Sequence, residues 1–130
     1  QEIAATDFEE YREVNELILQ GRKLGSDILI AQAKDSTTYD TVVISKAADA
    51  MLAMSGIEAS FVLAKNTQGF ISISARSRSK INVQRIMEEL GGGGHFNLAA
   101  AQIENMSLSE AGEKLTQLVL DELKEKEKEE

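Results

Sequence analysis

The sequence predicts a single α/β domain in which a mixed β-sheet of about four to five strands packs against helices. Segments with strand-like and helix-like patterns alternate along the chain, which is typical of this fold class. The chain has 130 residues, of which 42% are hydrophobic, and this suffices for one sizeable core. No internal repeat or linker composition divides it. We expect a connector helix within residues 1–26, the domain at 27–124, and a charged tail at 125–130 that frays.

The first half of the chain predicts a helix, a buried strand, a loop and a second helix. A first helix is predicted over residues 7–23, because the apolar side chains there follow a helical stripe of Phe8, Tyr11, Val14, Leu17 and Ile18. Residues 27–33 are a short apolar run bounded by polar residues, which indicates a strand, and 34–39 indicate a loop. Residues 41–54 begin with β-branched side chains, yet their apolar residues fall at helical spacing, so we predict a helix.

Residues 59–65 and 70–76 predict a β-hairpin, because the Asn-Thr-Gln-Gly segment between them has turn chemistry. The second strand alternates strictly. One of its faces therefore carries Ile71, Ile73 and Ala75, and the other carries Ser72, Ser74 and Arg76.

The remaining elements have clear end signals. Asn82 is a good N-cap for a helix that ends with Gly91 at its C′ position. A short strand is expected at 100–104. Ser107 and Glu110 form a capping box, and the last helix is expected over residues 108–124.

The charge is unevenly distributed. There are 14 basic and 22 acidic side chains, and a net charge of -8 argues against a polyanion-binding protein. The acidic excess lies at the two ends, whereas residues 59–87 contain five bases and no acid. Such a segment is either a solvated surface or part of an anion site. Its position directly before a glycine-rich loop favours the anion site.

That loop, Gly91-Gly92-Gly93-Gly94-His95, is the most specific feature of the sequence. Glycines allow several N–H groups to converge on one phosphate oxygen in a nest, although a helix stop followed by a tight turn would explain one or two of them. It is neither a P-loop nor a dinucleotide fingerprint, because the flanking residues of those motifs are absent. His95 could bond to a phosphate or a base, or serve only in the fold. Arg76 could bind phosphate through its planar guanidinium, or form a salt bridge.

Catalysis by this chain is not supported by any motif. No Asp-x-Asp, His-x-x-x-Asp or Gly-x-Ser-x-Gly spacing is present. The absence of cysteine and the single histidine exclude thiolate sites and His-based metal clusters. A binding domain is therefore favoured over a complete active site.

Residues 71–103 resemble the DHH-associated domain, the C-terminal domain of DHH phosphoesterases. Ser74, Arg76 and Ser77 match the family's Ser-x-Arg-Ser stretch, Gly92 to His95 match its Gly-Gly-Gly-His, and Ala99-Ala100 match the following Ala-Ala. Ala101 departs from the glycine of many relatives. The sequence of residues 81–95, together with the segments at 47–54 and 59–65, is similar to that of the membrane-anchored cyclic di-AMP phosphodiesterases of Firmicutes.

The resemblance implies that this chain holds the nucleotide for a DHH domain that carries two manganese ions and cleaves cyclic di-AMP to pApA. It implies a cytoplasmic domain of a longer protein anchored in the bacterial membrane. This chain alone is expected to be inactive, to bind no metal and to make no membrane contact. The residues expected to bind substrate are Ser74, Arg76, Ser77, Gly91, Gly92, Gly93, Gly94, His95 and Asn97.

Two alternatives stay open. The same module could belong to a nuclease that acts on short RNA or single-stranded DNA, although six aromatic residues and a short basic segment favour a compact ligand. It could also serve mainly in folding or as a homodimerisation module.

Overall fold

The computed structural model describes residues 5–129, with side chains from Phe8 onward. Its strands are β1 (Gly21–Leu24), β2 (Ile28–Gln32), β3 (Thr38–Tyr39), β4 (Ala59–Asn66), β5 (Ile71–Ser77), β6 (Gly93–Gly94) and β7 (Leu98–Ile103). Its helices are α1 (Ala5–Ile18), α2 (Thr41–Leu52), α3 (Val83–Glu89) and α4 (Leu108–Glu129). The predicted α/β class is confirmed. The sheet has seven strands rather than four to five, because β1, β3 and β6 were not expected.

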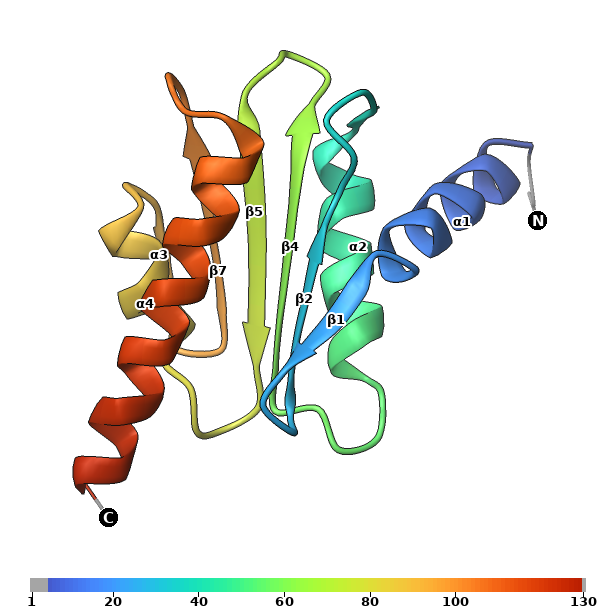
Figure 1. Cartoon of the computed structure of the whole chain (residues 1–130). Coiled ribbons are helices and arrows are strands. Elements are labelled where there is room, and N and C mark those ends of the chain that lie inside the picture. The colour runs from blue at the N-terminus through green and yellow to red at the C-terminus, as the bar shows by residue number, and fades with distance from the viewer. Residues whose placement is uncertain (1–4, 130) are drawn as a thin grey trace.

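The strands form one mixed sheet in the order β1-β2-β4-β5-β7-β6, with β3 beside the end of β4 (Figure 1). β2 and β3 run parallel to β4, and every other pair is antiparallel. The predicted hairpin is confirmed, since β4 and β5 pair from Ala59↔Ser77 to Lys65↔Ile71. This central hairpin fixes the register on which the site depends.

Helices cover the two faces of the sheet in pairs, so the chain buries two cores. α3 and α4 pack on the face that includes Ile73 and Phe61, and α1 and α2 pack on the face that includes Val62 and Ala64. Alternate residues of a strand point to opposite faces, so β4 contributes to both cores. The same alternation places Ser72, Ser74 and Arg76 of β5 together on one face, as the sequence predicts, and α2 packs on that face.

The first predicted helix is wrong beyond Ile18, because residues 21–24 form the edge strand β1 instead. β1 pairs with β2 through a turn at Gly25, whose φ of 72° is accessible to glycine at little cost. The predicted apolar stripe is also only partly buried. Leu17 is fully buried, but Phe8 and Tyr11 are 64% and 69% exposed, because the N-terminal half of α1 projects beyond the sheet (Figure 1).

The end of α1 is tied to the sheet by Tyr39. Its hydroxyl donates to Glu16 Oε1 at 3.0 Å, and burial together with this bond raises the pKa of Tyr39 to about 12. The contact holds α1 beside the segment that leads into α2.

α3 is terminated by a Schellman motif. Asn82 caps its N-terminus by accepting from the Arg85 N–H at 3.2 Å, as predicted. At the other end, the N–H of Gly91 donates to Glu88 O at 3.1 Å and that of Gly92 to Met87 O at 2.8 Å. Gly91 has φ 84°, which confirms its predicted C′ position.

α4 begins with the predicted capping box and continues through Glu129, five residues beyond its predicted end. The Ser107 N–H donates to Glu110 Oε1 at 2.9 Å, and the Glu110 N–H donates to Ser107 Oγ at 3.0 Å. The bond from the Ser107 backbone holds the pKa of Glu110 below its usual range.

Replacing Ser107 by alanine is expected to lower the free energy of unfolding by about 1 kcal/mol, because one N–H at the start of α4 loses its acceptor. Glu110 contributes stability above its ordinary pKa, and this contribution is lost as the pH falls through its depressed folded-state pKa. Urea unfolding of the Ser107→Ala and Glu110→Gln variants at pH 7 and pH 3 measures both effects. Ser109→Ala is the matched control, and equal losses for Ser107→Ala and Ser109→Ala would contradict the capping role.

Candidate functional site

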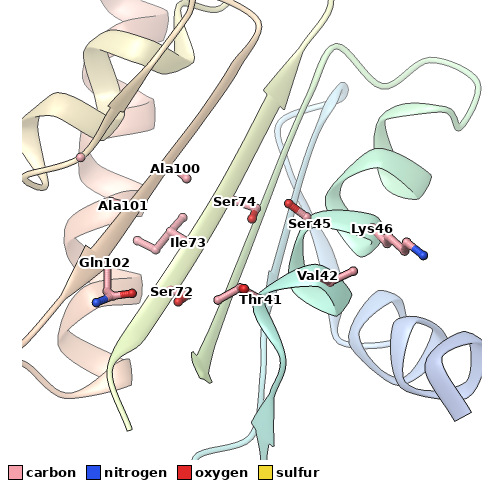
Figure 2. Close-up of a pocket in the computed structure, with 11 residues that line it drawn as sticks. Thr41, Val42, Ser45, Lys46, Ser72, Ile73, Ser74, Ala100, Ala101 and Gln102 are labelled. Atoms are coloured by element: carbon pink, nitrogen blue, oxygen red, sulfur yellow. The ribbon is translucent and has the colours of Figure 1, made fainter. Parts of the chain in front are cut away.

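A cavity of about 590 Å³ lies between the N-terminal half of α2 and the strands β5 and β7 (Figure 2). α2 packs on β4 and β5, but β7 carries exposed Leu98, Ala100 and Gln102 on this side of the sheet. The open sheet face beside the helix forms the floor of the cavity. Its lining comprises Thr41, Val42, Ser45, Lys46, Ser72, Ile73, Ser74, Gly92, Ala100, Ala101 and Gln102.

Hydroxyl groups supply most of the polar chemistry of this lining, and they come from Thr41, Ser45, Ser72 and Ser74. The ammonium group of Lys46 pairs with Glu10 of α1 and points away from β5 (Figure 2). Gln102 accepts a 3.4 Å hydrogen bond from Asn66 Nδ2. No carboxylate is among the described residues that line the cavity, so its chemistry suits an anionic or acceptor-rich ligand.

Two of the nine residues predicted to bind substrate, Ser74 and Gly92, line this cavity. Ser74 is 6% exposed and comes from the polar face of β5, as its alternation predicts. Gly92 reaches the cavity with its backbone, because it packs closely against Ala100 and Ala101 of β7 just before β6 pairs with that strand.

The glycine run is needed for the fold at three of its four positions. Gly91 takes the positive φ of the Schellman motif. A Cβ on Gly92 would lie 2.1 Å from Ala100 O, and one on Gly94 would lie 2.4 Å from Leu98 O. Gly93 is the one member of the run without such a requirement: its φ is not positive, and a Cβ added there would have no neighbour within 4 Å.

The expected nest of free N–H groups is not formed by Gly91, Gly92 and His95. The first two donate to the last carbonyls of α3, and the His95 N–H donates to Leu98 O at 2.7 Å. The end of α3 and the β6–β7 turn use these three N–H groups, so they are not free to bind an anion.

Arg76 lies against α2 rather than in the cavity lining. Its Nε donates to Asp49 Oδ1 at 2.6 Å, its Nη2 to Ser45 Oγ at 3.1 Å, and its Nη1 to Ala75 O at 3.0 Å. The residue is 7% exposed, so the salt bridge considered from the sequence is present, and it is largely buried on the arginine side.

The basic segment at 59–87 is largely neutralised by acids from outside it. Lys65 pairs with Asp35 at 3.1 Å, and Arg85 pairs with Glu122 at 3.4 Å, in addition to the Arg76–Asp49 pair. The segment therefore presents less free positive charge than its composition suggests.

Ser77 and Asn97 close the β6–β7 hairpin onto the end of β5. Ser77 Oγ donates to Phe96 O at 3.2 Å, and Asn97 Nδ2 donates to Arg78 O at 2.5 Å and Ser77 O at 3.2 Å. His95 is exposed on the same hairpin. These residues lie near Arg76 at the far end of β5 from Ser72.

Sequence reasoning did not place in the site Thr41, Ser45 and Lys46 from α2, Ser72 from β5 or Gln102 from β7. One signal was available, since Thr41 and Ser45 are four residues apart and share a face of the predicted helix. Another was the alternation of the last strand, which places Ala100 and Gln102 on one side. Which helix face meets which strand depends on the strand order, which the sequence does not predict.

Within residues 5–129, no group of three or more His, Asp and Glu side chains could hold a metal ion. In the same range, no helix is long and apolar enough to cross a membrane.

The family assignment follows from the sequence match over nearly the whole fold. Residues 25–126 match the DHHA1 domain family. The chain belongs to this family. The match runs from the β1–β2 turn into α4, so it includes the cavity and the glycine run of this DHHA1 domain.

The relatives of this DHHA1 domain include named cyclic di-AMP phosphodiesterases. It is 45% identical over 94 residues to GdpP of Geobacillus thermodenitrificans, 46% over 86 residues to PdeA of Listeria monocytogenes, and 51% over 77 residues to GdpP of Bacillus subtilis. These matches cover 72%, 66% and 59% of this chain but only 14%, 13% and 12% of those proteins. The chain thus corresponds to a small part of each relative.

Solved structures show the same fold at low identity. An exopolyphosphatase-related protein from Bacteroides fragilis superposes with a TM-score of 0.74 and 19% identity, over 86% of this chain and 34% of that one. A pGpG-specific phosphodiesterase, PggH of Vibrio cholerae, gives a TM-score of 0.59 and 17% identity, over 89% and 40%.

Proposed function

We propose that this DHHA1 domain is the substrate-binding part of a cyclic di-AMP phosphodiesterase and that it holds the nucleotide in the cavity between α2, β5 and β7. The observation that carries the proposal is the identity of 45–51% to three proteins of that name. The cavity supports it, since about 590 Å³ lies within the range of roughly 300–1,000 Å³ typical of small-molecule sites.

Hydrolysis of cyclic di-AMP to pApA would take place in a separate DHH domain of the longer protein, with water activated by metal ions, manganese in our expectation. The small share of each relative that this chain covers leaves ample length for such a domain and for a membrane anchor. In this arrangement the open face of β7 and the β6–β7 hairpin with His95 would face the catalytic domain. Contacts of Ser74, Gly92 and His95 with the nucleotide belong to this proposal.

A nuclease is the second candidate. The domain is 37% identical over 68 residues to the bifunctional oligoribonuclease and PAP phosphatase NrnA of Thermus thermophilus, which covers 52% of this chain and 21% of that protein. The higher identities to the cyclic di-AMP enzymes favour the first candidate. A purely structural or dimerising role is disfavoured, because it leaves the polar cavity without a use.

Calorimetry of the 130-residue chain with pApA and with cyclic di-AMP tests the proposal. We expect weak binding, with a dissociation constant on the order of 1 mM or about −4 kcal/mol, because in this proposal the separate DHH domain supplies the remaining contacts with the nucleotide. His95→Ala should weaken the binding further, whereas Ser36→Ala, an exposed serine away from the cavity, should not.

Two results would count against the proposal. Absence of heat with both dinucleotides, while circular dichroism shows a folded chain, would remove the binding role. Much tighter binding of a ten-nucleotide RNA with a steep salt dependence would instead favour the nuclease.

A further inference from the structure

Three serine hydroxyls line the cavity from two elements. Ser72 and Ser74 lie on β5 and are 7% and 6% exposed, and Ser45 lies on α2. Residues two apart on a strand share a face, so both β5 serines are directed to the side where α2 lies. Figure 2 shows the Ser45 hydroxyl directed from α2 toward β5, beside Ser74.

The hydrogen bonds of these serines leave each hydroxyl proton unused. A serine hydroxyl donates one hydrogen bond and accepts two. Ser45 Oγ accepts from Arg76 Nη2 at 3.1 Å, and Ser72 Oγ accepts from Asn66 Nδ2 at 2.9 Å. Within residues 5–129 neither proton has an acceptor.

Ser74 is the least satisfied of the three. Its hydroxyl has no hydrogen-bond partner in the described part of the chain, although the residue is more than nine-tenths buried. No enclosed side-chain oxygen or nitrogen of the described residues lacks a partner, so Ser74 Oγ opens on the cavity. Hydroxyls in such positions normally find a partner, and here only the cavity offers space for one.

Arg76 and Asn66 determine that Ser45 and Ser72 can act as hydrogen-bond donors toward a ligand in the cavity. Each donates to a serine oxygen and cannot accept its proton from the same nitrogen, so the proton is left for the cavity. Arg76 is held by Asp49, and Asn66 Oδ1 accepts from the backbone N–H groups of Gln68 and Phe70 at 2.9 and 3.1 Å. Both are positioning residues, because they act through the serines.

The ligand that fits is a group with several acceptor oxygens and negative charge. Three hydroxyl donors without acceptors and a lining without carboxylates suit a phosphate. We propose that the hydroxyls of Ser45, Ser72 and Ser74 bind a phosphate group of the ligand. The inference rests on the proposed function and deepens it, since it places a phosphate between α2 and β5 rather than in the glycine run.

The test is an NMR titration of the chain with inorganic phosphate, AMP and adenosine. Phosphate and AMP are expected to shift the backbone amide signals of the three serines, and adenosine is expected to shift them much less. Ser74→Ala and Ser45→Ala should each weaken AMP binding at least tenfold without changing adenosine binding. Ser60→Ala is the matched control, because this buried serine of β4 donates its proton to Ala48 O at 2.7 Å, away from the cavity.

The outcomes separate this site from the proposed function. If Ser74→Ala and Ser45→Ala bind AMP and pApA as tightly as Ser60→Ala does, the hydroxyl site is wrong while the binding role stands. If phosphate and AMP shift the serine amides but neither pApA nor cyclic di-AMP binds, the site stands and the proposed function fails. Absence of any shift at these amides with phosphate and AMP overturns the site. Thermal unfolding of each variant confirms that the comparison is made between folded chains.

Discussion

Replacing Gly92 by alanine is expected to destabilise the chain by about 3 kcal/mol and to lower its Tm by about 10 °C. A Cβ at this position would lie 2.1 Å from Ala100 O, 2.6 Å from Ala101 Cα and 2.7 Å from Ala101 Cβ. Two of these atoms belong to the backbone of β7, which is paired with β5 and β6 and cannot move alone. Gly92 would therefore move away from β7, and the hydrogen bond from its N–H to Met87 O in the cap of α3 would weaken. Urea unfolding followed by circular dichroism measures the loss.

The matched control is Gly93→Ala in the same glycine run. Its built Cβ meets no atom within 4 Å and its φ is not positive, so the expected change is within about 0.5 kcal/mol. The contrast between adjacent glycines isolates the close approach to β7 from the general entropy cost of glycine. Equal effects of the two substitutions would show that the close approach does not govern stability here.

The same pair of variants separates folding from binding in the run. Close packing against β7 requires glycine at position 92, whereas neither the backbone conformation nor the packing requires glycine at position 93. If Gly93→Ala leaves stability unchanged but weakens pApA binding, then a ligand approaches the backbone at this position. Such a result would support, at this one residue, the expectation from the sequence that the glycine loop contacts a phosphate group of the ligand.

Elements whose ends are set by their own residues can be predicted from the sequence. Asn82, Gly91 and the Ser107–Glu110 box each bond within a few positions along the chain, so α3 and the start of α4 follow from local chemistry. Strand β1 cannot be predicted in this way. Its residues Gly21–Leu24 have no strand pattern, and they become a strand because β2 offers them an edge. β3 and β6 have only two residues each and likewise depend on their neighbours.

The candidate site shows the same division. The alternation of β5 predicts that Ser72 and Ser74 share a polar face. The sequence does not predict that this face meets Ser45, because Ser45 belongs to a helix that docks through long-range packing in the core it shares with α1, β2 and β4. The role of Arg76 was left open for a related reason, since its acid partner, Asp49, lies on that same helix.

Removing Asp49 is expected to destabilise the chain more than removing Arg76, although both changes break the same ion pair. The Arg76 side chain is 9% exposed and that of Asp49 is 62% exposed. Asp49→Ala leaves a buried guanidinium without its carboxylate, at a cost of about 2 kcal/mol. Arg76→Met returns Asp49 to water and keeps most of the buried aliphatic volume, so the loss should be below about 1 kcal/mol. Urea unfolding of both variants gives the comparison.

The double variant sharpens this expectation. Once Arg76 is methionine, Asp49→Ala removes only an exposed carboxylate, so the double variant should be about as stable as Arg76→Met alone. Additive losses would contradict a coupled pair. Lys65→Met and Asp35→Ala serve as a matched exposed pair, and both should have small effects because Asp35 is 75% exposed and Lys65 is partly so.

Binding by the same variants decides between two roles of Arg76. If Arg76 acts by orienting Ser45, then Arg76→Met weakens AMP binding in the natural chain and has no further effect in the Ser45→Ala background. If Arg76 contacts the phosphate itself, the two substitutions weaken binding independently. The geometry favours the first result, because Nε and Nη2 already donate to Asp49 and Ser45, and Arg76 is absent from the cavity lining. The Arg76 guanidinium, for which the sequence left open phosphate binding or a salt bridge, would then act on the phosphate through Ser45, by leaving the Ser45 proton free for the anion.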